Sequence, residues 1–188
     1  QAGRPSDRPR RSHQWAVVFP EGADALTVRV YTIRHIRPGL GEIEVDVVRH
    51  AGGAFADWAE TADVGAQLGV IGPGGGFYPE GDWLLIGGDE TALPAISRIL
   101  EQRPADAEGP AVIGIRHADA RMEIAAPAGV TVEWVVGDDA ALIRAMEAVR
   151  PPLATDVAVW FAGEAEAARH LRKYFKERLG LSPGRVSS

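Results

Sequence analysis

The sequence predicts two domains, a β domain followed by an α/β domain. Residues 26–34 and 42–49 alternate polar with apolar side chains, which is typical of half-buried antiparallel strands. From residue 82 onward, continuous apolar runs alternate with segments whose apolar residues recur at helical spacing. A glycine-rich stretch at residues 72–76 separates the two patterns. We therefore predict a first domain over residues 1–78 and a second over residues 79–188.

The first domain is expected to be a β-barrel or a sandwich. Residues 15–20 form a short apolar run closed by Pro20, which indicates a strand. Residues 26–34 and 42–49 flank a Pro-Gly turn and predict a hairpin, and residues 64–71 predict a further strand. Residues 1–13 contain four arginines and are expected to be a solvated terminus or, alternatively, an anion-binding arm.

A short helix is predicted after the glycine pair at residues 52–53, because Phe55, Trp58 and Ala62 fall at helical spacing. Glycines before a helix let backbone N–H groups approach an anion closely, and the helix dipole favours negative charge there. The segment is thus a candidate diphosphate site. An ordinary turn into a packed helix explains the same residues.

The second domain has the pattern of a parallel, doubly wound sheet. Strands are predicted at residues 83–86, 111–115, 130–136 and 157–161. Helices are predicted around residues 93–100, 142–149 and 164–179. Such sheets bind ligands at the carboxyl ends of their strands, where residues 87–91 and 162–164 form loops. Neither loop matches G-x-G-x-x-G, so the spacing alone predicts a generic nucleotide-sized crevice.

Composition excludes several classes of function. The net charge of -6 opposes binding to nucleic acid and to anionic membranes. The chain has no cysteine, and its five histidines lack metal-site spacing, so redox chemistry requires an organic cofactor. No serine lies in a nucleophile elbow. No apolar run reaches the length of a membrane span and no signal core is present, so a cytoplasmic location is expected.

Arg29 and Tyr31 are the first candidate binding residues, because alternation places both on one face of a predicted strand. A guanidinium beside a phenol suits a ligand that carries both a diphosphate and a flat ring. The hydroxyl of Thr32 is placed to approach a ring nitrogen of such a ligand. An exposed strand face with an ordinary Arg–Tyr contact is the alternative.

Two charged segments of the second domain are further candidates. Asp89 and Glu90 precede a predicted helix, where they complement the helix dipole or line a dinucleotide site. The last helix carries five cations, at residues 169, 172, 173, 176 and 178, opposite an apolar face. They form either a solvated face or a docking surface for an anionic substrate or an electron donor.

Several motifs together resemble the siderophore-interacting proteins, flavin-dependent ferric-siderophore reductases of the ferredoxin-reductase-like superfamily. The motifs are R-V-Y-T-I-R (29–34), V-D-V-V-R-H (45–50), G-x-x-x-x-W-A ending at Ala59, G-D-E-T-A-L-P-A-I (88–96) and W-F-A-G-E-A (160–165). The resemblance implies an antiparallel β-barrel FAD-binding domain and a parallel-sheet NAD(P)H-binding-like domain. The implied function is reduction of ferric siderophores to release Fe(II) for intracellular use, with electrons from NADH, NADPH or ferredoxin passing through FAD.

The resemblance also implies residue roles. Arg29 would bind the FAD diphosphate, while Tyr31 and Thr32, the catalytic candidates, would contact the isoalloxazine ring and its N5. The remaining FAD-site residues would be Asp46, Val48, His50, Gly53, Ala54, Phe55 and Ala56. The residues facing the nicotinamide or the flavin edge would be Asp89, Glu90, Thr91, Ala162, Gly163 and Glu164. Arg116 and His117 would approach the dinucleotide ribose or its phosphate, and the substrate candidates are Arg172, Lys173 and Lys176.

The sequence departs from the family pattern in three places. Residues 53–56 read G-A-F-A where the family has G-P-A-S, which removes a hydroxyl contact to phosphate. Two barrel strands that usually precede Trp15 are missing, so the barrel is expected to be incomplete at its N-terminus, and the usual Tyr-Trp ending is missing too. The alternative functions are a general NAD(P)H:flavin or ferredoxin-type reductase, and a non-catalytic siderophore-binding module.

Overall fold

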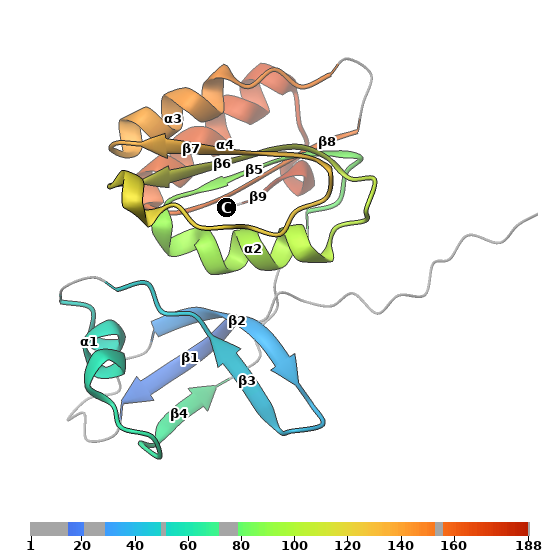
Figure 1. The fold of residues 1–188 in the computed structure, drawn as a ribbon. Coiled ribbons are helices and arrows are strands. Elements are labelled where there is room, and N and C mark those ends of the chain that lie inside the picture. Colours follow the sequence, from blue (N-terminus) through green and yellow to red (C-terminus); the bar gives the residue numbers. More distant parts are fainter. Residues whose placement is uncertain (1–14, 21–28, 50–51, 72–78, 153–155, 188) are drawn as a thin grey trace, which may run out of the picture. The chain divides into compact units, whose positions relative to one another are not determined.

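The structure is a computed structural model that describes residues 15–20, 29–49, 52–71, 79–152 and 156–187. The chain divides into two compact units, Gln1–Tyr78 and Pro79–Ser188, each of which is described by itself. Within the residues described, the first unit holds an antiparallel sheet and one helix, and the second holds a parallel sheet flanked by helices (Figure 1). None of the helices in the described ranges is long and apolar enough to cross a membrane.

The first unit is built on a four-stranded antiparallel sheet with the strand order β3-β2-β1-β4. The strands are β1 (Trp15–Pro20), β2 (Arg29–Arg37), β3 (Glu42–Val45) and β4 (Leu68–Ile71), and the helix is α1 (Ala54–Thr61). Strand β1 is central and pairs antiparallel with both β2 and β4. The predicted antiparallel strands are thus present, and those that the structure describes form an open sheet rather than a closed barrel.

The predicted hairpin is formed by β2 and β3, but its second arm is shorter than expected. Pairing runs from Arg37 with Glu42 to Ile33 with Val45, and the register shifts between Ile33 and His35. Such an irregularity bends the strand that contains it. The prediction of a strand over residues 42–49 is therefore wrong for residues 46–49, which leave the ladder. The predicted strand over residues 64–71 likewise shortens to Leu68–Ile71, because Gly65, at φ +97°, lies in a turn.

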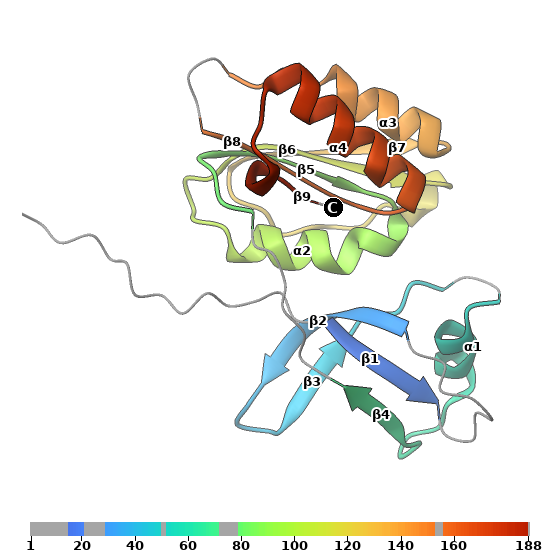
Figure 2. The same cartoon turned by 180° about the vertical axis from the view of Figure 1, so that it is seen from behind.

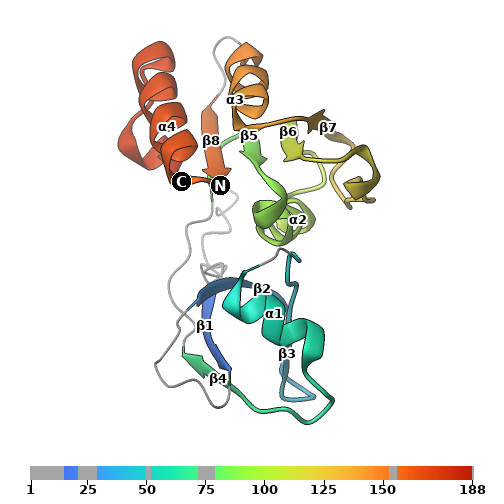
Figure 3. The same ribbon diagram turned by 90° about the vertical axis from the view of Figure 1, so that its left-hand side faces the viewer.

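The second unit is a five-stranded parallel sheet with the order β7-β6-β5-β8-β9, as the βα pattern predicted. Its strands are β5 (Trp83–Gly88), β6 (Glu108–Ile115), β7 (Gly129–Val136), β8 (Val157–Ala162) and β9 (Val186–Ser187). Its helices are α2 (Leu93–Gln102), α3 (Asp139–Ala148) and α4 (Ala165–Leu179), with short 3-10 turns η1 (Glu90–Ala92), η2 (Ala118–Ala120) and η3 (Pro183–Arg185). Helix α2 covers one face of the sheet, while α3 and α4 cover the other (Figures 2 and 3).

Strand β5 ends in two glycines that are closely packed on both sides. A Cβ atom on Gly87 would lie 2.4 Å from the sulfur of Met146, and one on Gly88 would lie 2.4 Å from the carbonyl oxygen of Ala162. The Met146 side chain would have to move away from a Cβ at residue 87, whereas the backbone carbonyl of Ala162 excludes a Cβ at residue 88. The glycines therefore let α3 and β8 approach β5, and the polar loop that follows β5 begins at the carboxyl edge of the sheet.

Candidate functional site

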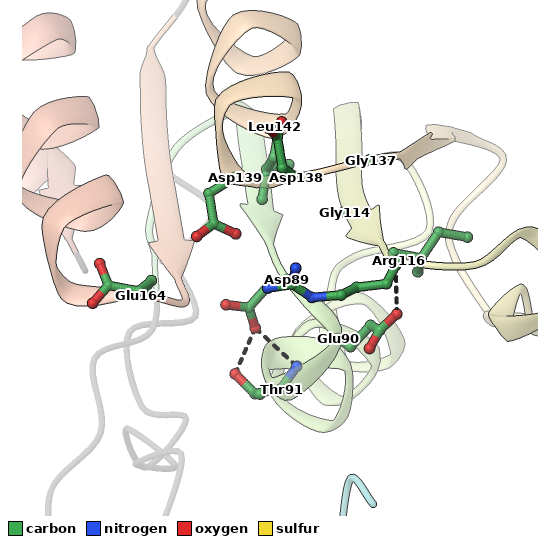
Figure 4. A pocket seen from close by; sticks show the side chains of 11 residues that line it. Asp89, Glu90, Thr91, Gly114, Arg116, Gly137, Asp138, Asp139, Leu142 and Glu164 are labelled. Atoms are coloured by element: carbon green, nitrogen blue, oxygen red, sulfur yellow. Dashed lines mark hydrogen bonds between the residues drawn. The ribbon is translucent and has the colours of Figure 1, made fainter. Parts of the chain in front are cut away.

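A pocket with a cavity volume of about 150 Å³ lies at the carboxyl edge of the parallel sheet (Figure 4). The strands β5, β6, β7 and β8 each supply lining residues at or just beyond their carboxyl ends. In a doubly wound sheet this edge is where ligands bind, because the strand ends and the helix starts leave polar groups there. The fold thus positions the pocket at the expected place.

The loop after β5 is held by hydrogen bonds from its own acidic residues. The Asp89 carboxylate accepts the backbone N–H of Thr91 at 2.8 Å and the Thr91 hydroxyl at 2.5 Å. The Glu90 carboxylate accepts the backbone N–H of Arg116 at 2.7 Å, which ties this loop to the end of β6. These bonds give the two carboxylates fixed places in the pocket wall.

Two more carboxylates cap the helices that start at this edge. The Asp138 carboxylate accepts the backbone N–H of Ala141 at 2.9 Å at the start of α3. The Glu164 carboxylate accepts the backbone N–H of Glu166 at 2.6 Å at the start of α4. These capping carboxylates accept hydrogen bonds from backbone N–H groups at the helix N-termini. In many nucleotide-binding folds the same groups donate to a bound phosphate instead.

The loop after β8 lies directly against the loop after β5. Gly163 has φ +155°, and a Cβ atom there would lie 2.7 Å from the Asp89 carboxylate. Only glycine suits both this backbone conformation and this approach. The structure therefore brings together the two loops that the sequence singled out: Asp89, Glu90, Thr91 and Glu164 all line the pocket, while Ala162 ends β8 beside them.

The pocket is strongly acidic. Its lining includes the carboxylates of Asp89, Glu90, Asp138, Asp139 and Glu164 and one cationic side chain, that of Arg116. The Arg116 side chain extends across the pocket toward Asp89 (Figure 4). The sequence interpretation missed the Asp138–Asp139 pair, although its place after an apolar strand and before a helix is the same signal that identified Asp89.

In the first unit, Tyr31 belongs to a cluster of three aromatic side chains. Its ring centre lies 4.6 Å from that of Phe55, and the Phe55 ring stacks on Trp58 at 5.4 Å. Burial raises the pKa of the Tyr31 phenol above its ordinary value, and the positive charge of Arg29 offsets part of that rise. The phenol is therefore neutral at physiological pH. Strand alternation puts Thr32 on the opposite face of β2 from Tyr31.

The start of α1 offers backbone groups rather than side chains. Gly53 is the N-cap residue and makes no side-chain hydrogen bond to the helix. Phe55 and Ala56 are only 4% and 1% exposed, so their side chains pack inside the unit, while Ala54 is exposed. Contact of Phe55 or Ala56 with a phosphate would therefore have to come from their backbone N–H groups.

The remaining predicted residues are dispersed. Asp46 pairs with Arg34 at 3.5 Å, Val48 is half-buried, and His50 lies outside the described residues. Arg172 and Lys173 are exposed and Lys176 is half-buried on α4. These three cations do not line the pocket at the sheet edge, and neither does His117.

Both units match models of one protein family. The Siderophore-interacting FAD-binding domain matches residues 2–77, and the Siderophore-interacting protein model matches residues 81–188. Among solved structures, a siderophore utilization protein from T. fusca is 32% identical with a TM-score of 0.83, and the match covers 98% of this chain and 80% of that one.

Relatives found by sequence include reductases of ferric chelates. An uncharacterized protein of Mycobacterium tuberculosis is 37% identical over 86% of this chain and 62% of its own length. The ferric vibriobactin reductase ViuB of Vibrio cholerae is 32% identical over 90% of this chain and 65% of its own length. The NADPH-dependent ferric-chelate reductase of Escherichia coli is 29% identical over 85% of this chain and 64% of its own length.

The chain thus spans less than two thirds of the length of these relatives. The family models nevertheless match it almost from end to end and confirm the resemblance carried by the sequence motifs. The chain belongs to the siderophore-interacting protein family.

Proposed function

We propose that the protein reduces ferric siderophores with electrons that NADH or NADPH supplies through FAD. The observation that carries this proposal is the match of the Siderophore-interacting FAD-binding domain to residues 2–77, the unit in which β2 presents Arg29 and Tyr31. The names of the relatives from V. cholerae and E. coli support ferric chelates as the substrate class. In this proposal residues 1–78 bind FAD and residues 79–188 receive the dinucleotide.

The first unit has groups that fit FAD. Arg29 is exposed on the same strand face as Tyr31, so a guanidinium and a phenol ring project side by side. Helix α1 starts without a side-chain cap, which leaves its first-turn N–H groups available to an anion. A diphosphate linked to a flat ring system matches this combination of donors and aromatic surface.

Each of these residues has a defined task in the proposed site. Arg29 and the start of α1 hold the diphosphate, and Phe55 fixes the Tyr31 ring so that it packs on the isoalloxazine. Thr32 lies on the opposite face of β2 from Tyr31, so in this proposal it approaches N5 past the edge of the strand rather than from the Tyr31 face. Asp46, Val48 and His50 complete the site. When bound, FAD supplies the redox chemistry, because it accepts two electrons together and gives them up singly.

The second unit would orient the electron donor. The loops that carry Asp89, Glu90 and Thr91 and that run from Ala162 to Glu164 form one wall of the pocket, and their hydrogen bonds keep it rigid. A rigid wall would hold the nicotinamide in one orientation, which lowers the entropic cost of reaching a reactive geometry.

The chelate is the substrate. Siderophores hold Fe(III) through hard oxygen atoms, and Fe(II) binds such ligands much more weakly, so one-electron reduction releases the metal. Arg172, Lys173 and Lys176 are proposed to attract an anionic ferric chelate, because they place three positive charges on one helix.

Anaerobic mixing of the FAD-loaded chain with each dinucleotide tests the donor half of the proposal. We expect NADH or NADPH to bleach the flavin absorbance within seconds and an added ferric siderophore to restore it. A colourless protein that takes up no FAD, or a loaded protein that neither dinucleotide reduces, would contradict the proposal. Restoration by free flavin but not by ferric siderophore would favour a general flavin reductase instead.

A further inference from the structure

The charges around the pocket at the sheet edge bear on which dinucleotide enters it. Five carboxylates and one guanidinium line a cavity of about 150 Å³. Within the described part of the chain, that guanidinium, on Arg116, makes neither an ion pair nor a side-chain hydrogen bond. The pocket therefore has one cation for an incoming phosphate, surrounded by negative charge.

The N-termini of α3 and α4, which lie at this edge, also disfavour a second phosphate group. In many nucleotide sites a helix N-terminus attracts phosphate through unpaired N–H groups and the positive end of the helix dipole. Here Asp138 and Glu164 place their own carboxylates on those groups at the starts of α3 and α4. A second anion brought to either helix start would meet a negative charge that already occupies it.

Arg116 can serve one phosphate group. It follows β6, and its side chain extends into the pocket toward the end of β5 (Figure 4). A guanidinium binds phosphate oxygens in a bidentate manner, so it suits a phosphate that every nicotinamide dinucleotide carries. The additional 2′-phosphate of NADPH would then have carboxylates as neighbours, among them Asp138 and Asp139 beyond the end of β7.

Resting on the proposed function, in which a dinucleotide enters this pocket, we infer that the site binds NADH in preference to NADPH. Arg116 binds a phosphate common to both dinucleotides, and the Asp138–Asp139 pair repels the 2′-phosphate. A 2′-phosphate carries close to two negative charges at neutral pH, so the repulsion is specific to NADPH. The chain thereby differs in donor preference from the E. coli relative, whose name gives NADPH.

Equilibrium binding of two adenosine phosphates to the FAD-loaded chain isolates the 2′-phosphate. We expect 5′-AMP to bind about tenfold more tightly than 2′,5′-ADP in low salt, since the two differ only in the 2′-phosphate. The affinity for NADH should exceed the affinity for NADPH by a similar factor. Raising the salt concentration should narrow the gap, because the repulsion is screened.

Variants that remove charges test which side chains cause the preference for NADH. The double variant D138N/D139N keeps an amide that can cap α3, and it should bring 2′,5′-ADP binding close to that of 5′-AMP. The variant Arg116→Gln should weaken both ligands. Glu177→Gln, which removes an exposed carboxylate of α4 that does not line the pocket, is the matched control and should leave the ratio of affinities unchanged.

The possible contrary results separate the two proposals. Equal or tighter binding of 2′,5′-ADP and NADPH by the unaltered chain would overturn the NADH preference and leave NADPH as the donor. A ratio that D138N/D139N does not move would overturn the role of the aspartate pair. Binding of neither dinucleotide would overturn the donor assignment in the proposed function and the preference with it.

Discussion

Glu90 and Arg116 are joined across the pocket wall by a hydrogen bond in which the backbone N–H of Arg116 donates to the Glu90 carboxylate at 2.7 Å. The bond connects the loop after β5 to the residue that follows β6, 26 positions along the chain. It fixes the point from which the Arg116 side chain enters the pocket. An acidic side chain thus positions the cation that we assign to phosphate binding.

Replacing Glu90 by alanine should weaken NADH binding by several fold while changing the free energy of unfolding by less than about 1 kcal/mol, because the freed N–H can reach water. Glu90→Gln keeps an acceptor oxygen and should bind NADH nearly as the unaltered chain does. Titration calorimetry and thermal unfolding measure the two effects. Equal NADH binding by the alanine and glutamine variants would contradict a positioning role for Glu90.

Replacing Gly163 by alanine should destabilise the second unit by about 1–3 kcal/mol. The residue has φ +155°, and the new Cβ would lie 2.7 Å from the Asp89 carboxylate. Gly184 is the matched control, since a Cβ atom there meets no other atom within 4 Å. Chemical denaturation of the two variants should separate them, and equal midpoints would show that the loops after β5 and β8 are not in contact.

Much of this architecture was predictable because buried strands and helices have recognisable patterns of apolar residues in the sequence. Strand β5 was predicted from its continuous apolar run, and all six of its residues are buried. Strand β9 has two residues, too few to show any periodicity. Strand β3 ended early because pairing depends on its partner β2, where the register shifts, and alternation within residues 42–49 carries no information about that partner.

The candidate site was predictable where polar loops follow apolar strands, as for Asp89 and Glu164. Asp138 shows the same pattern as Asp89 but lies outside the family motifs, and the pocket that brings the two residues together depends on tertiary structure. Phe55 was expected at the diphosphate, but its side chain is buried against Tyr31. Sequence spacing located the segment without showing which way this side chain faces.

Replacing Phe55 by alanine should destabilise the first unit by about 3–5 kcal/mol, because a buried ring that contacts Tyr31 and Trp58 is lost. Phe55→Leu fills most of the space and should cost less. FAD affinity, followed by flavin fluorescence, should fall in both variants as the Tyr31 ring loses its support. If folded Phe55→Leu binds FAD as tightly as the unaltered chain, the Phe55 ring does not hold Tyr31 in place for FAD.

The raised pKa of Tyr31 gives the first unit a specific pH dependence. Because the folded-state pKa exceeds the unfolded value of 10.0, the folded state holds the phenolic proton more strongly. The corresponding stability is fully present below pH 10 and is lost as the pH rises through the folded-state pKa. Tyr31→Phe should therefore lose less stability than the unaltered chain above pH 10. Parallel pH profiles for the two proteins would contradict this expectation.

A single-turnover reaction tests the central claim of flavin-dependent ferric-siderophore reduction most directly. The FAD-loaded chain is reduced chemically without oxygen, the excess reductant is removed, and a ferric siderophore is added together with a chromogenic Fe(II) chelator. The account predicts that the flavin is reoxidised while about two Fe(II) ions form per flavin, since each flavin holds two electrons. A flavin that stays reduced, with no Fe(II) formed above a protein-free control, would contradict it.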